Sequence, residues 1–485
     1  MNYSLPQDFI KRMKEYLGEE YDAFIASYEN QEVKGIRFRP IKGDDIRQDE
    51  MKKLSEKVLN RLDGVSDIPW VNYGFSYCDN DEALRPGKHP YHEAGVYYIQ
   101  EPSAMSPVAY LDVKPGDRVL DLCAAPGGKS TQIAALMHGQ GILVSNEIMP
   151  DRAKILSENI ERMGVRNALV ISEDPRNISD RFAGFFDRIL VDAPCSGEGM
   201  FRRSETAVNE WSLENVDICA KRQEWILDEA AKMLSPGGRL VYSTCTFSKE
   251  EDEQSVEKFL SRHDDFRLAE MQLFDGMRRG YGDTGVRIWP HLVSSEGHYV
   301  CALDKNASGD YNGEPKKYMP PCGYQTDMTK KERADLKEMF SFLESNITDS
   351  EFESGEIKNR RFTKFKDQIY MLPSECPSLN GIKVLRAGLH IGTVLKNRFE
   401  PGHALAKCLD KTGVKNYYDI NVISDDADTK EGMNLAVKYI SGETFNLEGE
   451  NGWYLILTDG CSVGWGKLTN GIMKNHYPKG LRKRI

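Results

Sequence analysis

Two cysteines each stand directly behind a buried apolar run in the middle of the chain. Cys195 lies in Asp192-Ala-Pro-Cys-Ser-Gly-Glu-Gly199, and Cys245 lies in Ser243-Thr-Cys-Thr-Phe247. A lone cysteine near the end of a strand is most often a small core residue. Two of them, each in turn-forming sequence, favour a reactive site instead, because an ionised thiol is an effective nucleophile.

A glycine-rich loop precedes both cysteines and separates a predicted strand from a predicted helix. Its sequence is Asp121-Leu-Cys-Ala-Ala-Pro-Gly-Gly-Lys-Ser130. Gly127 and Gly128 allow a sharp turn and a close approach to a ligand, and the helix that follows presents free N–H groups. The loop matches neither the phosphate-loop pattern nor GxGxxG, which disfavours a nucleoside triphosphate or a dinucleotide. An ordinary tight connection would have similar sequence, so the loop alone is weak support for a ligand.

Acidic residues follow the next two predicted strands. Glu147 ends the run 141–147, where a carboxylate can accept hydrogen bonds from both hydroxyls of a ribose. Asp174 follows the run 168–172 and could hold an adenine amino group. Each acid alone is as readily a solvated loop residue. Together with the glycine-rich loop, they favour an adenosine-type cofactor.

A thiol beside an adenosine-type methyl donor suits methylation of carbon 5 of cytosine. Carbon 5 is a poor nucleophile until a thiolate adds to carbon 6 and makes it enamine-like. Asp192 is placed to neutralise the charge that develops at ring N3, either protonated or hydrogen-bonded. The carbon 5 proton must then be removed before the thiol can leave, and Cys195 could act in that step.

The motifs, taken in order, resemble those of the Nop/Sun family of RNA (cytosine-5) methyltransferases. They are CAAPGGKS, DAPCSGEG and STCTFS, and the segments 91–104, 287–291 and 296–299 are similar to the family as well. The resemblance covers about residues 90–305. It implies S-adenosyl-L-methionine as the cofactor, S-adenosyl-L-homocysteine as its product, and RNA as the substrate.

The resemblance also implies a role for each matching residue. Cys245 would be the nucleophile, Cys195 the helper in product release, and Asp192 the residue between cofactor and base. The choice of Cys245 rests on the family, because DNA cytosine methyltransferases are described as attacking with the Pro-Cys motif. Glu147 would bind the ribose and Asp174 the adenine. The methionine part of the cofactor would lie against Cys123, Ala124, Ala125, Pro126, Gly127, Gly128 and Lys129.

These motifs need a sheet that brings several strand ends together, and the chain predicts one. Buried apolar runs at 118–122, 141–147, 168–172, 186–192 and 238–244 alternate with helical patterns such as 129–137 and 151–163. This alternation predicts an α/β fold with a mostly parallel, doubly wound sheet, and 296–303 suggests a late antiparallel strand. With the resemblance, the expectation is a Rossmann-like class I methyltransferase domain.

The remaining sequence predicts smaller units on both sides of this domain. We expect an N-terminal α+β RNA-binding unit at 1–90, the catalytic domain at 91–305, a linker at 306–325, a small α+β connecting unit at 326–380 and a PUA-like β-barrel RNA-binding domain at 381–485. Phe9, Met13, Leu17 and Tyr21 predict an amphipathic helix. Short strands such as 382–385 and 389–395 predict the barrel. The layout resembles the family's subtype that methylates bacterial small-subunit ribosomal RNA.

Three basic clusters are compatible with contacts to RNA phosphates or with ordinary solvated faces. The first is the alternating run 34–42, which predicts a strand with one buried and one cationic face. The other two consist of Arg202, Arg203, Lys221 and Arg222, and of the tail residues Lys474, His476, Lys479, Arg482, Lys483 and Arg484.

Bulk composition narrows the class of protein. The chain has 485 residues, 40% of them hydrophobic and 29% charged, which is typical of a folded multidomain protein. The net charge of -11 argues against a surface that coats nucleic acid everywhere but permits a local basic groove. The ten cysteines form no CxxC pair, and no signal-peptide core or membrane-length apolar stretch is seen. We expect a cytoplasmic monomer without a metal and without membrane contact.

Three functions from different classes follow from these observations. The first is an RNA cytosine-5 methyltransferase, acting on ribosomal RNA in the small subunit or alternatively on transfer RNA. The second is a catalytically silent RNA-binding ribosome-assembly protein, which the intact Asp192, Cys195 and Cys245 speak against. The third is a small-molecule methyltransferase, which the basic flanking domains make less suitable.

Overall fold

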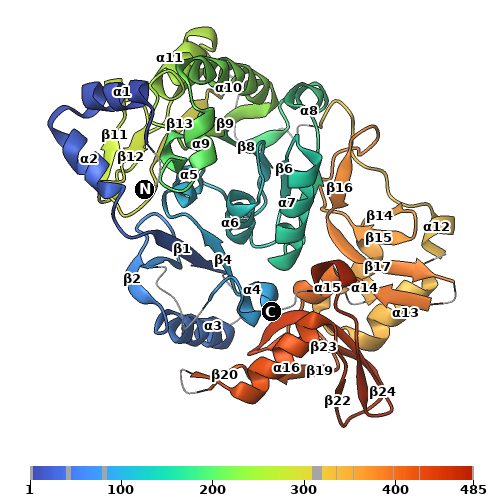
Figure 1. Ribbon diagram of the computed structural model, residues 1–485. Helices are drawn as coiled ribbons and strands as arrows, with labels where there is room; N and C mark the ends of the chain where they lie inside the picture. Colours follow the sequence, from blue (N-terminus) through green and yellow to red (C-terminus); the bar gives the residue numbers. More distant parts are fainter. Residues whose placement is uncertain are drawn as a thin grey trace.

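A ten-stranded sheet forms the centre of the molecule (Figure 1). The computed structural model describes residues 4–39, 45–78, 85–307, 319–334, 336–352, 354–396, 398–424 and 427–482. The strands of this sheet are β5 (Arg118–Asp121), β6 (Ile142–Asn146), β7 (Ala168–Ile171), β8 (Phe186–Asp192), β9 (Leu234–Thr244), β10 (Phe266–Leu268), β11 (Met277–Arg279), β12 (Val286–Ile288), β13 (His298–Lys305) and β16 (Val384–Ala387). Their order is β11-β12-β13-β9-β8-β5-β6-β7-β16, with β10 paired to β13.

The middle of the sheet is parallel, and both faces are covered by helices. Strands β7, β6, β5, β8 and β9 run parallel, whereas β13 and β16 flank them antiparallel. Because side chains alternate along each strand, Leu120 and Val144 face one core and Val119 and Leu143 face the other. The first core includes side chains from α8 (Pro175–Arg181), α10 (Leu213–Met233) and α11 (Glu253–Arg262). The second includes side chains from α5 (Ser106–Tyr110), α6 (Gly128–Met137) and α7 (Pro150–Arg162). The predicted Rossmann-like methyltransferase fold is confirmed.

The N-terminal unit is a four-stranded antiparallel sheet with four helices. Its strands, in spatial order, are β2 (Asp63–Asp67), β3 (Gly74–Cys78), β1 (Val33–Phe38) and β4 (Tyr97–Gln100). Its helices are α1 (Gln7–Leu17), α2 (Tyr21–Ser27), α3 (Asp45–Leu59) and α4 (Pro90–Ala94). The predicted amphipathic helix is present as α1, with Phe9 and Met13 buried. It ends at Leu17, and Tyr21 begins a separate helix.

Helices α1 and α2 pack on the catalytic domain rather than on their own sheet. Phe9 lies edge-on to Phe201, with ring centroids 4.9 Å apart. Phe24 lies edge-on to Phe247 at 5.5 Å, and Phe247 stacks on Trp289. In Figure 1 the same helices lie beside β11 and β12. Phe201 and Phe247 follow the two cysteine motifs, so the N-terminal helices support the segments that carry the thiols.

The prediction of a one-sided cationic strand at 34–42 is wrong for the part that the structure describes. Residues 35–38 are all buried, because β1 is a central strand and contacts α6. The guanidinium of Arg37 donates to the Gly128 carbonyl at 3.0 Å and to Thr131 Oγ1 at 2.8 Å. Residues 40–42 lie outside the described residues.

The C-terminal part divides differently from the prediction. Residues 382–385 were expected in the barrel, but β16 pairs with β7 at the edge of the central sheet. Residues 389–395 form β17 (Leu389–Leu395), which belongs to a separate sheet with β14 (Phe362–Phe365), β15 (Gln368–Met371) and β18 (Arg398–Pro401). Helices α12 (Lys330–Ala334), α13 (Lys337–Asn346) and α14 (Ser354–Asn359) accompany this sheet. Of the predicted linker at 306–325, residues 308–318 lie outside the described part of the chain.

The last unit is a curled five-stranded sheet, a half-barrel of the PUA-like kind. Its strands in spatial order are β19 (Tyr417–Ile420), β23 (Gly452–Thr458), β24 (Cys461–Thr469), β25 (Ile472–Asn475) and β22 (Phe445–Asn446). The short pair β20 (Ile423–Ser424) and β21 (Ala427–Asp428) and the helices α15 (His403–Lys407) and α16 (Lys430–Ser441) complete it. Tail residues Lys483 and Arg484 lie outside the described residues. No helix within the described ranges is long and apolar enough to cross a membrane.

Candidate active site

The two cysteines predicted to react lie side by side at the carboxyl edge of the sheet. Cys195 follows β8 and Cys245 follows β9, and these strands are parallel neighbours. The two sulfur atoms are 3.3 Å apart, within hydrogen-bond distance of one another. The hydrogen bond to Cys245, followed by burial, raises the pKa of Cys195 well above its usual value. The two thiols thus share one hydrogen bond, in which either sulfur can be the donor.

Asp192 is the centre of a charged cluster next to this pair. Lys129 Nζ donates to Asp192 Oδ2 at 2.7 Å, and Ser243 Oγ donates to Oδ1 at 2.8 Å. His298 Nε2 lies 3.5 Å from Oδ1. Burial opposes ionisation of Asp192, but the charge of Lys129 and the contact with His298 outweigh it and lower the pKa. Of the two states that the sequence left open, the surroundings thus favour the ionised, hydrogen-bonded carboxylate.

The glycine-rich loop lies between β5 and α6, on the same edge. Gly127 has φ of +112°, a conformation that side chains with a Cβ rarely adopt. A Cβ on Gly128 would meet the side-chain amide of Gln100 within 3 Å and would displace it. Gly127 is therefore favoured by the backbone conformation, and Gly128 by its close contact with Gln100. The loop is also held from outside, because the Arg37 bonds described above tie β1 to the start of α6.

Asp121, the last residue of β5, is the buried acid that sequence reasoning overlooked. Its Oδ2 accepts from Ser130 Oγ at 2.7 Å, and its Oδ1 is buried without a partner in the part of the chain that the structure describes. Burial raises the pKa of Asp121 to about 7. A buried oxygen without a donor is costly, so Oδ1 is suited to a donor from a ligand. The sequence did contain an indication of its role, because Asp121 is the first residue of the glycine-rich motif.

The two acids assigned to ribose and adenine have different surroundings. Glu147 directly follows β6 and is buried; its Oε1 accepts from the Met149 backbone N–H at 2.9 Å, and Arg152 lies 3.4 Å from Oε2. Asp174 instead caps α8, since its Oδ1 accepts from the backbone N–H of Arg176 at 2.9 Å. Asp174 therefore already has a structural task, as expected of an aspartate at a helix N-terminus.

Other polar residues reach the site or its surroundings without having been predicted. His298 and Ser243 come from β13 and β9 and meet at Asp192, as described above. Arg202 and Arg203, considered for an RNA channel or a solvated face, both pair with Glu296 at 2.7 Å, so they bind a buried acid instead. Lys221 and Arg222 on α10 are exposed. The sequence patterns did not predict these pairs, because the two members of each pair lie far apart along the chain.

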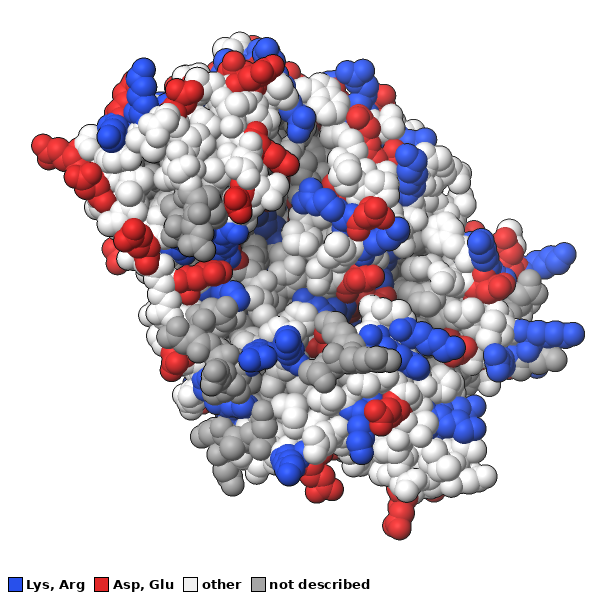
Figure 2. Space-filling view, viewed as in Figure 1, with Lys and Arg blue, Asp and Glu red and all other residues white. Residues whose placement is uncertain are grey.

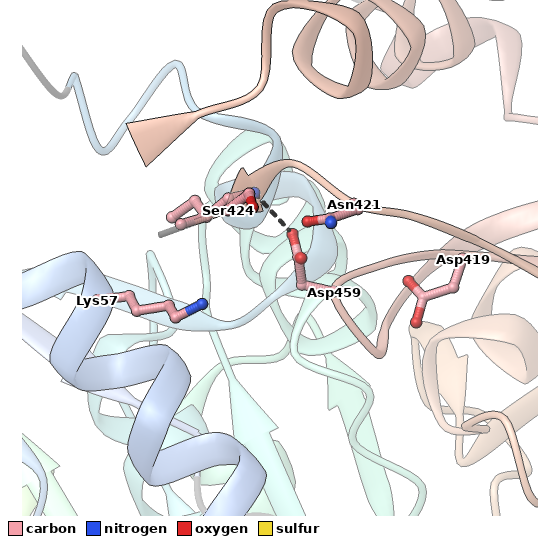
Figure 3. Close-up of a pocket in the computed structure, with 6 residues that line it drawn as sticks. Lys57, Asp419, Asn421, Ser424 and Asp459 are labelled. Carbon is pink, nitrogen blue, oxygen red and sulfur yellow. Dashed lines mark hydrogen bonds between the residues drawn. The ribbon is translucent and has the colours of Figure 1, made fainter. Parts of the chain in front are cut away.

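A separate cavity of about 390 Å³ lies far from the cysteines, between α3 and the C-terminal sheet. In Figure 3, Lys57 reaches from α3 toward Asp419 on β19, Ser424 on β20, and Asn421 and Asp459 in the adjoining turns. The acids there are already engaged: Asp459 Oδ2 accepts from Tyr91 and from the Val422 backbone, and Asp419 accepts from Gly460. Across the described residues, no group of three or more His, Cys, Asp or Glu side chains is arranged to hold a metal ion.

A doubly wound sheet with a glycine-rich first loop, joined to a PUA-like half-barrel, defines a Rossmann-like methyltransferase with a PUA-type extension. Family models agree along the chain: 16S rRNA methyltransferase RsmB/F matches residues 108–304, and the N-terminal domain of 16S rRNA methyltransferase RsmF matches 5–102. The RsmF rRNA methyltransferase first C-terminal domain matches 341–409, and the methyltransferase RsmF PUA domain matches 433–483.

Relatives match over nearly the whole chain. Ribosomal RNA small subunit methyltransferase F of Vibrio vulnificus is 33% identical over 490 residues, covering 99% of this chain and 98% of the relative. The enzyme of the same name from Vibrio cholerae is 30% identical with the same coverage. The chain belongs to the ribosomal RNA small subunit methyltransferase F family, within the Nop/Sun methyltransferases.

Solved structures support the same fold. A methyltransferase homolog protein from Pyrococcus horikoshii superposes with a TM-score of 0.54 at 26% identity, over 63% of this chain and 96% of that one. NSun6 from Pyrococcus horikoshii with SFG gives a TM-score of 0.54 at 24% identity, over 62% of this chain and 98% of that one, and supports the fold alone.

Proposed function

We propose that this protein is an S-adenosylmethionine-dependent RNA cytosine-5 methyltransferase that forms 5-methylcytosine in small-subunit ribosomal RNA. The observation that carries the proposal is the pair of thiols 3.3 Å apart, beside an aspartate that is bonded to Lys129. The choice of ribosomal RNA is supported by the names of the relatives, which cover the chain from end to end.

The residues at the glycine-rich loop fit a methionine-based cofactor. Asp121 Oδ1 lacks a donor among the described residues, and the α-ammonium of the cofactor is a donor of the right charge. The backbone of residues 123–128 turns closely enough to lie against the methionine part, with Lys129 behind it. Glu147, at the end of the next strand, is proposed for the ribose. When bound, S-adenosylmethionine supplies an electrophilic methyl group on its sulfonium.

Asp174 is the least supported of the proposed cofactor residues. Its Oδ1 is taken by the α8 cap, which leaves Oδ2 for an adenine amino group. Because a cap is a sufficient reason for an aspartate at this position, we propose the adenine contact as an addition to the cap rather than a replacement for it.

In the proposed attack, Cys245 is the nucleophile and Asp192 prepares the base. The Cys245 thiolate bonds to carbon 6, and the displaced electron pair passes to carbon 5 and the N3–C4 side of the ring. N3 takes a proton from solvent as this charge develops. Asp192, held ionised by Lys129 and Ser243, accepts hydrogen bonds from the exocyclic amino group and from that N3–H. The cytosine must leave its stack to reach both groups, which suits a single-stranded or splayed segment of RNA.

In the proposed release, Cys195 changes from acid to base. Its raised pKa depends first on the bond to Cys245. Once the Cys245 sulfur is a neutral thioether, that first cause is gone, although burial still raises the pKa of Cys195. In the proposed step Cys195 gives its proton to water. Its thiolate then takes the carbon 5 proton, the carbon 5–carbon 6 double bond re-forms, and the electron pair of the carbon–sulfur bond returns to Cys245.

The flanking units are proposed to grip the RNA. On the face in Figure 2, lysine and arginine side chains gather along the hollow across the middle of the molecule, interspersed with acidic ones. Local cationic stretches of this kind can follow a phosphate backbone although the net charge is -11. The N-terminal unit, the connecting unit and the PUA-like half-barrel are proposed as the RNA-binding parts, of a monomeric, cytoplasmic enzyme that needs no metal.

The test is to trap the covalent intermediate. We expect Cys195→Ala, incubated with S-adenosylmethionine and small-subunit ribosomal RNA, to give a shifted, RNase-sensitive band on a denaturing gel. The band should be absent from the Cys195→Ala/Cys245→Ala double variant and from Cys219→Ala, a matched control because Cys219 is buried in α10. Transfer RNA in parallel incubations tests the alternative substrate.

Each outcome of that experiment decides a different point. Adducts with transfer RNA but not with ribosomal RNA would reverse the choice of substrate. An active wild type without any adduct would remove Cys195 from the release step. A wild type that binds RNA but forms no 5-methylcytosine would favour the silent ribosome-assembly protein.

A further inference from the structure

Two buried glutamates, Glu198 and Glu251, connect the two segments that carry the thiols, and the mechanism above does not use them. These segments are the Cys195 loop, residues 193–199 after β8, and the Cys245 loop, residues 245–250 after β9. The loops are already joined by a few direct bonds: Gly199 N–H donates to the Cys245 carbonyl at 2.9 Å, and the hydroxyls of Ser196 and Thr246 are 2.9 Å apart. The first of these bonds holds Cys245 through its own carbonyl. The two carboxylates add bonds to the residues next to each cysteine, each from the opposite loop.

Glu251 follows the Cys245 loop in sequence, but its carboxylate binds the Cys195 loop. The backbone N–H of Ser196, the residue after Cys195, donates to Oε2 at 2.9 Å, and Ser196 Oγ donates to Oε1. Gln223 Nε2 donates to the same Oε2 at 2.9 Å and to the carbonyl of Pro194, the residue before Cys195, at 3.0 Å. Both neighbours of Cys195 are therefore held through one carboxylate and one amide.

Glu198 shows the reverse arrangement. It belongs to the Cys195 loop, but its Oε2 accepts from the backbone N–H of Phe247, two residues after Cys245, at 2.9 Å. Its Oε1 accepts from Trp211 Nε1 at 3.0 Å, and the Thr246 side chain is a further partner. Phe247 is in addition packed on Trp289 and on Phe24 of the N-terminal unit. The turn after Cys245 is therefore fixed by Glu198 and by aromatic packing.

Charge on these groups is expensive and has to be compensated. Both carboxylates are fully buried, and burial raises the pKa of Glu198 and brings that of Glu251 to about 7. A buried carboxylate is retained only where several donors satisfy it. An apolar pair would fill the same space at lower cost, so the arrangement is best explained by what the carboxylates hold in place.

We propose that Glu251 and Glu198 are positioning residues for the two thiols: Glu251 fixes Cys195 for product release, and Glu198 fixes Cys245 for attack. Neither touches a sulfur atom, the base or the cofactor. The inference rests on the proposed function, because only a two-cysteine reaction has two steps that can fail separately. The inference predicts that the same conservative change slows a different step at each glutamate: product release at Glu251 and attack at Glu198.

Glutamine is the appropriate replacement at both positions. It keeps the size of the side chain but offers one acceptor oxygen where the carboxylate offers two, so one donor in each set loses its acceptor. Displacing a reacting group by a fraction of an ångström to one ångström reduces its rate by about tenfold to a hundredfold. Ser196→Ala is a second variant for the Cys195 loop, because it removes one donor and leaves Glu251 intact.

The experiment separates methyl transfer from release in the full-length protein. Single-turnover incorporation of labelled methyl from S-adenosylmethionine into small-subunit ribosomal RNA reports attack and transfer. The fraction of protein in an RNase-sensitive adduct on a denaturing gel, and steady-state turnover, report release. For Glu251→Gln and Ser196→Ala we expect single-turnover transfer within about threefold of wild type, turnover reduced about tenfold, and more adduct. For Glu198→Gln we expect single-turnover transfer reduced about tenfold or more, and no accumulation of adduct.

Glu229→Gln is the matched control, because Glu229 is also buried in the catalytic domain and accepts from a serine hydroxyl, that of Ser179. The control and the wild type should agree in all three measurements. Equal losses of transfer and turnover in both glutamate variants, with a lowered melting temperature, would show a merely structural role and overturn the inference. Unchanged kinetics in both would overturn it as well. If Cys195→Ala traps no adduct and the wild type is inactive, the proposed function fails, whereas a trapped Cys195→Ala adduct with indistinguishable glutamate variants refutes only this inference.

Discussion

The cysteine site and the seam between the catalytic domain and the C-terminal units both bury ionisable side chains, but they treat them differently. We define the C-terminal seam by Glu161 on α7, Arg386 on β16, His390 on β17, and His403 and Lys407 on α15. In the cysteine site, Asp192 and Glu251 accept from two or more donors each. Unpartnered buried atoms occur in both regions: among the described residues they include Arg386 Nη1, His390 Nε2 and His403 Nδ1 in the seam, and Asp121 Oδ1 and His298 Nε2 in the cysteine site. The difference lies in which groups are kept charged.

The seam limits its electrostatic cost by keeping several groups neutral. Burial lowers the pKa of His390 and of His403 to about 4, and lowers that of Lys407 well below its usual value. Lys407 Nζ nevertheless donates to the Glu93 carbonyl of the N-terminal unit and to Ser462 on β24, so it joins parts far apart in sequence. The cysteine site keeps Asp192 and Lys129 charged instead. The difference indicates that one region is organised for chemistry and the other for docking, and activity and stability should respond separately.

The largest effect is expected for the nucleophile. Cys245→Ala should reduce methyl transfer to ribosomal RNA on the order of 10³-fold or more, because it removes the proposed nucleophile that bonds to carbon 6. The urea midpoint should remain near that of the wild type, since little apolar surface is lost at this half-buried position. Labelled-methyl incorporation and urea unfolding measure the two quantities. A variant that loses stability and activity together would break the proposed separation.

Asp192→Asn is the next test on the catalytic side. The amide keeps the contact with Ser243 but removes the negative charge bonded to Lys129, so single-turnover methyl transfer should fall by roughly 10²-fold to 10³-fold. Binding of S-adenosylmethionine, followed by calorimetry, should change much less. Lys129→Met is the complementary variant, because it removes the other half of the pair. Activity within tenfold of wild type in both would argue against a charged role for Asp192.

In the seam, acid should destabilise the fold through the two histidines. Their folded pKa of about 4 is below the ordinary value of 6.5, so the unfolded chain binds more protons between these pH values. The free energy of unfolding must therefore fall as the pH falls from 6.5 toward 4, by up to about 3 kcal/mol for each histidine. His390 and His403 face Glu161, Arg386 and Lys407, and none of these groups reverses the sign.

Urea midpoints of the wild type and His403→Gln at pH 7.5, 6 and 5 measure this effect. The variant should lose less stability on acidification than the wild type, because glutamine does not titrate. Methyl transfer at pH 7.5 should be the same in both proteins. If the urea midpoints of the wild type and of the variant fell equally with pH, groups other than His403 would account for the acid sensitivity.

The same contrast explains what the sequence could predict. The parallel strands, the glycine-rich turn and the two cysteines were predictable, because each is encoded by a local pattern and strand ends in a parallel sheet meet at one edge. Asp121 was overlooked although it begins the glycine-rich motif, because its burial depends on packing. Arg37 illustrates the limit: its alternating neighbours predicted a solvated or RNA-contacting face, but a contact with Thr131, far along the chain, buries it.

The seam could not be predicted for the same reason. The strand at 384–387 has the composition of a barrel strand, and its pairing with β7 is determined by tertiary contacts alone. Arg386 and Glu161 form their ion pair across 225 positions of sequence. Neither the periodicity nor the spacing of residues in the sequence indicates partners so far apart.

The smallest effect is expected where the N-terminal and C-terminal units meet at the surface. Lys411 Nζ lies 3.1 Å from Glu50 on α3, and the two side chains are 38% and 52% exposed. Exposed pairs of this kind contribute about 1 kcal/mol or less, because solvent screens the charges and ordering the side chains costs entropy. Glu50→Ala should therefore change the free energy of unfolding by less than about 1 kcal/mol. A double-mutant cycle with Lys411→Ala measures the coupling directly. The coupling energy could instead be as large as the free energy of unfolding that titration of His403 removes at acid pH. In that case docking would depend on surface charge, and the buried seam would not be what holds the units together.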